Sequence, residues 1–305
     1  MGGVKKEDLI ALMKAAVEQN VRSLPVVVEV PKIGGVAKGD EETLVLVLSD
    51  VHFGHKTPTT SSRVVANRLA RLSRRIVRIA KLLRPSYTIK NLVVFWLGDN
   101  VQHDLVGRFV SLDELEGTVM KQVFKWAVPN FERFFLTLAQ HFERVDVYCV
   151  RGNHGMTRKN AGEDTNWDTV IYKTVELRLQ NQKNIRFKIE EDGFYQIVKI
   201  YKWGFFITHG DSIRTFLNIP FYGQIQRAMR MRGAVRGNFH YVVYGHFHVA
   251  AVYAWNDMEI FTNGCFVTDD QWVLKKMGMA SSAVQLLFGV HPRKGVTFRY
   301  RVWLD

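Results

Sequence analysis

Residues 43–52 have the sequence Thr-Leu-Val-Leu-Val-Leu-Ser-Asp-Val-His. The uninterrupted apolar run is typical of a strand that is buried inside a sheet. It ends at two side chains of another kind, Asp50 and His52. We therefore predict a buried strand that carries a carboxylate and an imidazole to one edge of a sheet.

Four later strand-like runs also end in polar side chains of these kinds. Taken singly, a Gly-Asp pair is usually a turn and an Asn-His pair usually a loop, so each motif alone is a weak sign of metal binding. Together they are stronger, because ligands collect at the edge where the strands of an α/β sheet end. The polar residues at these ends are Asp99, Asn153 with His154, His209, and His246 with His248.

The chemistry of these side chains limits the metal. None is a thiolate, so a structural zinc site of the cysteine type is not expected. Carboxylate, amide and imidazole groups suit manganese, iron or zinc, and would also accept cobalt or nickel. Even seven ligands from these eight side chains would be too many for one tetrahedral ion. They fit two ions that share a carboxylate at a separation of roughly 3.5–4 Å.

The order of elements predicts an α/β fold. Strand–helix units come first and strands follow, which indicates one domain of two packed sheets. We expect residues 1–40, with a helical pattern over 7–18, to form an N-terminal helical and extended appendage, and 41–305 to form the main domain. The predicted helices cover 61–84, 112–141 and 166–180; the predicted strands cover 43–48, 91–97, 145–150, 185–190, 194–201, 203–208, 241–244, 249–256, 258–262 and 296–304, with a mixed segment at 212–238.

Composition bears on partners and location. The chain has 42 Lys and Arg against 29 Asp and Glu, a net charge of +13. This excess favours polyanionic partners such as nucleic acid, although it can also serve solubility alone. Cys149 and Cys265 lie in apolar surroundings and are expected to be buried free thiols. With no apolar signal core at its start and no run of 18 apolar residues, the chain is expected to be cytoplasmic and not membrane-bound. Its oligomeric state is left open.

Five motifs between residues 44 and 265 carry a resemblance to a known family. In their order along the chain they resemble the motifs of the calcineurin-like metallophosphoesterases, whose fold is a sandwich of two mixed β-sheets flanked by helices. The chain is also similar to phage-encoded members, and in motif spacing to the SbcD-type nuclease subunits. The motifs are Asp50-Val51-His52-Phe53-Gly54, Gly98-Asp99, Gly152-Asn153-His154, His209-Gly210 and Gly245-His246-Phe247-His248.

The resemblance implies a role for each motif residue. Asp99 would bridge two divalent ions, for which we take manganese as the first choice. His154 would not be a ligand; it would stand over the phosphate and stabilise charge or protonate the leaving oxygen. The implied reaction is hydrolysis of a phosphate ester by metal-activated hydroxide. The implied ligands are Asp50, His52 and His248 for one ion, and Asn153, His209 and His246 for the other.

The third motif departs from the family pattern. The family usually has Asp or Glu after the motif histidine, and here the residue is Gly155. That carboxylate often supports the histidine or its loop, so Glu163, Asp164 or Asp168 is a possible substitute. His55 and His103 lie just past the first two motifs, and a surface or loop-packing role is the favoured interpretation for both.

Two basic segments bear on the substrate. The arginines of the helix at 68–81 could form a solvated outer face or a binding stripe, and we slightly favour the solvated face. Arg230 and Arg232, before the fifth motif, and Arg158, after the third, are candidate phosphate contacts. We favour a phosphodiester of nucleic acid or a nucleotide. The alternatives are a phosphomonoesterase acting on a phosphoprotein or a small metabolite, and a metal-binding scaffold with little turnover.

Overall fold

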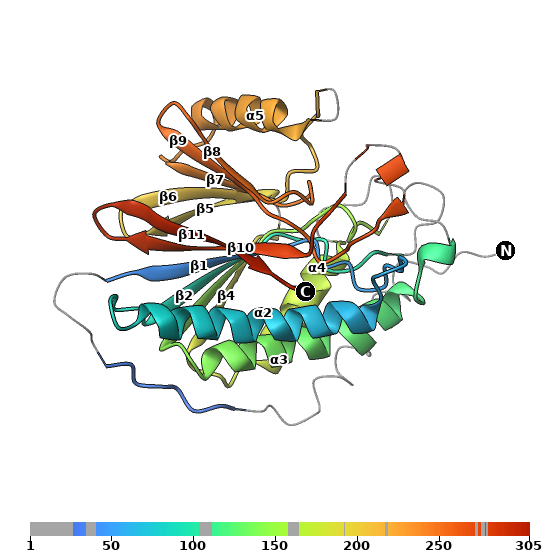
Figure 1. Cartoon of the computed structure of the whole chain (residues 1–305), viewed down its shortest axis with the longest axis horizontal. Coiled ribbons are helices and arrows are strands. Elements are labelled where there is room, and N and C mark those ends of the chain that lie inside the picture. The colour runs from blue at the N-terminus through green and yellow to red at the C-terminus, as the bar shows by residue number, and fades with distance from the viewer. Residues whose placement is uncertain are drawn as a thin grey trace.

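Two packed β-sheets flanked by helices form the chain, as Figure 1 shows. The structure is a computed structural model, and it describes residues 27–34, 41–103, 112–157, 165–191, 193–216, 219–271, 274–275, 278 and 280–305. The predicted fold class is confirmed. Among the residues described, no helix is long and apolar enough to cross a membrane.

The first sheet has six strands in the order β11-β10-β1-β2-β3-β4. Four of them run parallel to one another, β10 is antiparallel to β1 and β11 is antiparallel to β10, so the sheet is mixed. The parallel strands are β1 (Thr43–Leu48), β2 (Asn91–Trp96), β3 (Arg144–Cys149) and β4 (Ile185–Ile189); the others are β10 (Val284–His291) and β11 (Gly295–Trp303).

The second sheet has five strands in the order β5-β6-β7-β9-β8. The strands β6, β7 and β9 are parallel, and the two edge strands are antiparallel to their neighbours. Their bounds are β5 (Tyr195–Ile200), β6 (Trp203–Thr208), β7 (Tyr241–Tyr244), β8 (Ala251–Trp255) and β9 (Met258–Thr262).

Strand β1 explains why the two layers pack. All six of its residues are buried. Val45 and Val47 contribute to the core between the sheets, together with aromatic side chains such as Phe205 and Phe288. The alternate leucines face the opposite way and join the core under the helices, because successive side chains of a strand point to opposite faces. The continuous apolar run of the sequence is therefore a strand covered on both sides.

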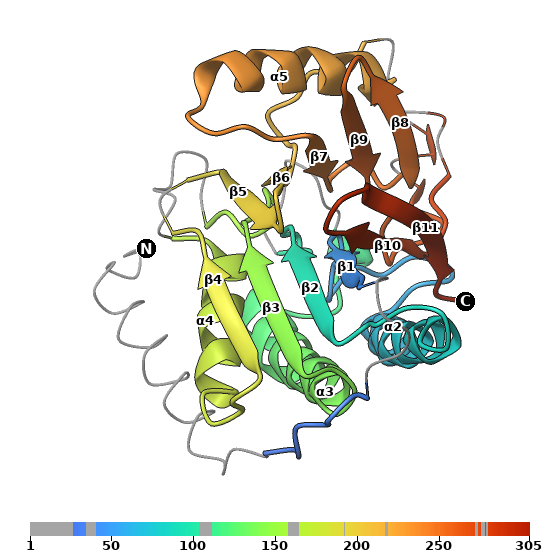
Figure 2. The same cartoon turned by 90° about the vertical axis from the view of Figure 1, so that its left-hand side faces the viewer.

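Helices cover the outer face of each sheet (Figures 1 and 2). On the first sheet lie α2 (Ser62–Leu83), a π-helical segment (Lys121–Ala127) that continues into α3 (Val128–Ala139), and α4 (Trp167–Arg178), after a short 3-10 turn (Leu112–Glu114). On the second sheet lies α5 (Pro220–Ala234), which occupies the segment predicted as mixed. The start of α2 follows from its sequence, since the Ser61 side chain accepts a hydrogen bond from the Val64 amide.

The structure adds one element that the sequence did not predict. Strand β10 lies between β1 and β11, and all of its residues are buried. Its pattern is interrupted by Gln285 and Gly289, which weakens an apolar-run signal. Gln285 is tolerated there because its amide oxygen accepts from the Ser49 amide at 3.0 Å and from the Asn263 side chain at 2.8 Å.

The proposed N-terminal appendage falls mostly outside the described residues, and so does the helix expected over 7–18. Within 1–40 the structure describes residues 27–34, which form neither helix nor strand. Val28 exchanges two hydrogen bonds with the Gln182 side chain, and the Ile33 amide donates to Glu143. The division at residue 40 stays a prediction.

Candidate metal centre

The carboxyl ends of five parallel strands bring the motif residues together. Strands β1, β2 and β3 of one sheet and β6 and β7 of the other each lead into one motif. Their side chains form three groups whose possible ligand atoms lie within 4.8 Å of one another. The groups are Asp50 with His52 and His248, Asp99 with His209 and His246, and His52 with Asp99 and His154.

The backbone at these residues is unusual. The described part of the chain has nine non-glycine residues with positive φ. Such conformations are uncommon outside glycine, even though Asp and His adopt them more readily than most residues, and they cluster at functional sites. No sequence motif predicts this clustering. Five of the nine are candidate ligands, namely Asp50, His52, Asp99, His246 and His248, with φ between 51° and 66°.

The first group suits a cation shared between its nitrogen and oxygen atoms. The Nε2 atoms of His52 and His248 face each other at 3.2 Å, and His248 Nε2 lies 3.3 Å from Asp50 Oδ1. The carboxylate is held in place, because Asp50 accepts hydrogen bonds from the His246 amide at 3.0 Å and from Ser49 Oγ at 2.5 Å. Three donor atoms that converge on one point fit a divalent ion.

The second group gives a sharper test of fit. His209 Nδ1 lies 2.6 Å from the Leu97 carbonyl oxygen, so this nitrogen is the donor. Its Nε2 then faces two oxygen atoms, Asp99 Oδ2 and Asn153 Oδ1, each at 3.0 Å. A neutral imidazole would present a lone pair to both acceptors. A proton or a metal ion must therefore lie between His209 Nε2 and these oxygens. In metal sites a ligating histidine commonly donates its other ring nitrogen to a backbone carbonyl, as His209 does here.

Electrostatics within the group agree with a site for positive charge. Burial alone would lower the pKa of His209, yet the Asp99 carboxylate raises it to about 10. Burial would raise the pKa of Asp99, yet His209 and His154 hold it well below its usual value. Burial and the neighbouring His209 lower the pKa of His246 to about 4. The protein therefore keeps a buried carboxylate ionised and His246 neutral, which are the forms that bind metals.

Asp99 lies between the two groups. Its Oδ2 is 3.0 Å from His209 Nε2 and 4.0 Å from His52 Nε2, and its Oδ1 accepts from the His154 amide at 2.8 Å. The neighbouring Gly98 has φ +84°, and a Cβ there would lie 2.1 Å from the Gly152 nitrogen. The second and third motifs thus approach too closely for any side chain at that position.

His154 is oriented by a separate contact. Its Nδ1 lies 3.1 Å from the Gln102 carbonyl oxygen, and its ring centroid is 4.6 Å from that of His52. It is half-buried, unlike His52 and His209. Because it also belongs to one of the ligand groups, its assignment as a non-ligand stays a prediction.

Asp168 supplies a carboxylate to the loops of the second and third motifs, where the family's usual acidic residue is replaced by Gly155. Its two oxygens accept from the amides of Asp99 and Asn100 at 3.0 Å and of Gly152 at 2.9 Å. It reaches them from the first turn of α4, whose start is capped by Asn166. Of the three acids considered as substitutes, Asp168 makes these contacts; Glu163 and Asp164 lie outside the described residues.

The same packing explains the glycine. A Cβ at Gly155 would lie 2.0 Å from Asn166 Oδ1 and 3.0 Å from the Asp168 nitrogen. We expect Gly155→Asp to lower the free energy of unfolding by about 1–3 kcal/mol, because the Asn166 cap must move. Thermal melting measures this effect. Gly233→Asp is the matched control, since a Cβ there meets nothing within 4 Å. Equal melting temperatures for the two variants would contradict the account of the third motif.

The candidate phosphate contacts are not gathered at this site. Arg158 lies outside the described residues. Arg230 is exposed on α5, and Arg232 pairs with Asp257, with atoms 2.5 and 2.7 Å apart. Asp257 lies in the turn before β9, at the amino ends of β7 and β9, whereas the metal ligands follow the carboxyl end of β7. The structure therefore does not bring Arg232 to the metal centre, because α5 runs back along the sheet.

Several supporting residues were missed by sequence reasoning. Ser49, Asn263 and Gln285 form a buried hydrogen-bonded chain behind Asp50. They come from segments far apart in the chain, so no local pattern links them. His55 is buried, with its Nε2 3.9 Å from an Asp270 oxygen, in keeping with a loop-packing role. Cys149 and Cys265 are buried free thiols, as expected.

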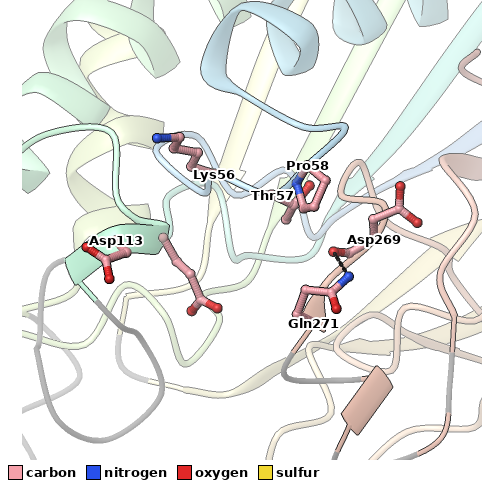
Figure 3. A pocket seen from close by; sticks show the side chains of 7 residues that line it. Lys56, Thr57, Pro58, Asp113, Asp269 and Gln271 are labelled. Atoms are coloured by element: carbon pink, nitrogen blue, oxygen red, sulfur yellow. Dashed lines mark hydrogen bonds between the residues drawn. The ribbon is translucent and has the colours of Figure 1, made fainter.

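A pocket of about 260 Å³ lies beside the first motif (Figure 3). It is lined by Lys56, Thr57 and Pro58, by Asp113 and Glu114, and by Asp269 and Gln271. None of the candidate metal ligands lines it. Three acids against one lysine make it a poor site for a phosphate group.

The sequence model of the calcineurin-like phosphoesterases matches residues 43–250. No curated protein gives a significant match. Similar solved structures include an archaeal phosphodiesterase (14% identity, TM-score 0.39, 85% of this chain and 99% of that chain). Others are Vps29 with zinc from Entamoeba histolytica (13%, 0.39, 86% and 99%) and a hypothetical protein from Pyrococcus horikoshii (14%, 0.43, 86% and 89%).

Proposed function

This chain belongs to the calcineurin-like phosphoesterase family, and from that premise we propose that it hydrolyses phosphodiesters of nucleic acid at a centre of two divalent metal ions. The observation that carries the proposal is Asp99, whose Oδ2 lies 3.0 Å from His209 Nε2 of one proposed ligand set and 4.0 Å from His52 Nε2 of the other. One carboxylate common to two sets of ligands is the arrangement that a bridged pair of ions requires.

The residues divide into two sets around Asp99. Asp50, His52 and His248 would hold one ion, and Asn153, His209 and His246 the other. When bound, such ions acidify a water molecule and neutralise charge on phosphate oxygens. Manganese is the first choice among the metals that this mixture of oxygen and nitrogen donors accepts.

His154 would act on the leaving group. The contact between its Nδ1 and the Gln102 carbonyl oxygen orients the ring beside His52 and Asp99, where a substrate phosphate would bind. From there it can donate a hydrogen bond to the phosphate or a proton to the departing oxygen. General acid catalysis of this kind contributes roughly a hundred- to ten-thousandfold in rate.

The preference for a nucleic-acid diester rests on charge. The net charge of +13 attracts polyanions more strongly than small monoesters. The arginines of α5 no longer support this preference, since Arg232 is paired at the far end of the sheet.

Hydrolysis assays test the proposal directly. Bis-p-nitrophenyl phosphate, p-nitrophenyl phosphate, and labelled single- and double-stranded DNA are compared in manganese and in EDTA. We expect manganese-dependent cleavage of the diester and of DNA. Turnover of the monoester alone would replace the proposal with a phosphatase. Metal binding without turnover of any of the four would leave the scaffold alternative.

A further inference from the structure

The outer face of α2 and α3 is uniformly basic. Helix α2 contains no acidic residue. Over the segment 121–139 the single acid is Glu132, which is buried and pairs with Arg178 at 2.7 Å. The exposed charged side chains are Arg63, Arg74, Arg78 and Lys81 on α2, and Lys121, Lys125 and Arg133 on the neighbouring segment. We call these seven residues the basic face.

The other arginines of α2 have a structural task. Arg68 binds the Asp305 carboxylate at 2.6 Å and the Phe266 carbonyl oxygen at 2.6 Å. Arg71 donates to the Leu304 carbonyl oxygen, and Arg75 to that of Asp305. These three attach residues 304–305 to the helix. The seven residues of the basic face form no ion pair within the described part of the chain, so their charges are left to solvent or to a partner.

The basic face begins at the metal centre. The Ser62 side chain, at the start of α2, accepts from the Gly54 amide of the first motif at 3.0 Å. Gln122, beside Lys121, accepts from the His103 amide at 2.8 Å just past the second motif. Both helices run from there along the first sheet, side by side in Figures 1 and 2. From Arg63 to Lys81 the row spans about 27 Å of helix at 1.5 Å per residue.

We propose that the basic face binds the phosphate backbone of double-helical nucleic acid. This proposal deepens the proposed function, on which it rests, because it names the form of the substrate. A row of cations without acids complements a regular row of phosphates. A surface that binds single-stranded nucleic acid would need exposed aromatic side chains on which the bases stack. No aromatic side chain of this face is exposed, since Trp126 is half-buried.

An anionic membrane fits the basic face less well. Helices that lie on membranes insert an apolar face between the lipids. The apolar face of α2 is instead buried against the sheet. Leu82, at the end of α2, is the one large apolar side chain of 62–83 and 121–139 that is exposed.

Charge-reversal variants test the proposal by fluorescence anisotropy with a labelled DNA duplex. One variant carries Arg74→Glu, Arg78→Glu and Lys81→Glu, and a second carries Lys121→Glu, Lys125→Glu and Arg133→Glu. The control carries Lys199→Glu, Lys202→Glu and Lys294→Glu, which change the net charge equally. These exposed lysines lie on β5 and in the β5–β6 and β10–β11 turns. Binding is measured on the full chain, loaded with metal and again in EDTA to prevent hydrolysis.

We expect each helix variant to bind the duplex at least about tenfold more weakly than the wild type. The slope of log affinity against log salt concentration should become shallower by about 3, because three phosphate contacts are lost. The control should keep the slope of the wild type. An equal loss in all three variants, no loss in the helix variants, or tighter binding of single strands than of duplex would overturn the proposal. A wild-type chain that hydrolyses the small diester but does not bind duplex would refute the basic face alone. Duplex binding through the face without hydrolysis would refute only the proposed function.

Discussion

Asp99→Asn should abolish hydrolysis and reduce the amount of bound metal. The substitution keeps the shape of the side chain, so the His154 amide can still donate to Oδ1. It removes the negative charge that faces His209 and His52. Because one carboxylate would serve two ions, both lose a ligand at once. We expect kcat to fall by on the order of a thousandfold or more, measured with bis-p-nitrophenyl phosphate together with metal analysis.

Glu191→Gln is the matched control for this experiment. Glu191 is exposed and pairs with Lys173 at 2.9 Å, so its loss removes a carboxylate away from the motifs. Thermal melting shows whether the Asp99 variant folds. If it does not fold, Asp50→Asn takes its place, because it should weaken mainly one ion. Normal turnover in a folded Asp99→Asn protein would rule out the bridged pair.

His154→Ala should keep the metal and lose rate. The side chain is held by the Gln102 carbonyl oxygen, and its proposed role concerns the leaving oxygen. We expect kcat to drop roughly a hundred- to ten-thousandfold while metal content stays at the level of the wild type. The loss should be smaller for a substrate with a good leaving group, such as p-nitrophenolate, than for DNA, since the former needs less protonation.

Metal content decides between the two roles of this histidine. His154 Nε2 or Nδ1 lies within 4.8 Å of possible ligand atoms of His52 and Asp99. A variant that loses about half of its metal would make His154 a ligand. His141→Ala is the control, because His141 lies at the end of α3, outside the motifs, and its removal should change neither quantity.

Much of the site was predictable because each motif directly follows a strand. Asp50 follows β1 and Asp99 follows β2, and these two strands are parallel neighbours in register from Leu44 and Leu92. A run of apolar residues that ends in Asp or His therefore identifies both the strand and the edge at which its ligand lies. The two-sheet architecture was predictable for the same reason, since β1 must be covered on both faces.

The supporting contacts were not predictable because they depend on close approach between distant segments. Asp168 reaches the second and third motifs only because α4 begins beside the strand ends, and Gly155 is required by the position of Asn166. The spacing of the arginines likewise could not distinguish structural from exposed side chains. Arg68 binds the carboxyl-terminal residues, whereas Arg74 faces solvent. Strand β10 was missed because its buried Gln285 is satisfied by Ser49 and Asn263, from other segments of the chain.

We propose that Asp99 joins two metal ions, and anomalous diffraction from crystals grown with manganese would locate those ions. We expect two peaks roughly 3.5–4 Å apart, one among Asp50, His52 and His248, the other among Asn153, His209 and His246, with the Asp99 carboxylate in contact with both. A single peak, or two peaks of which Asp99 contacts only one, would contradict it.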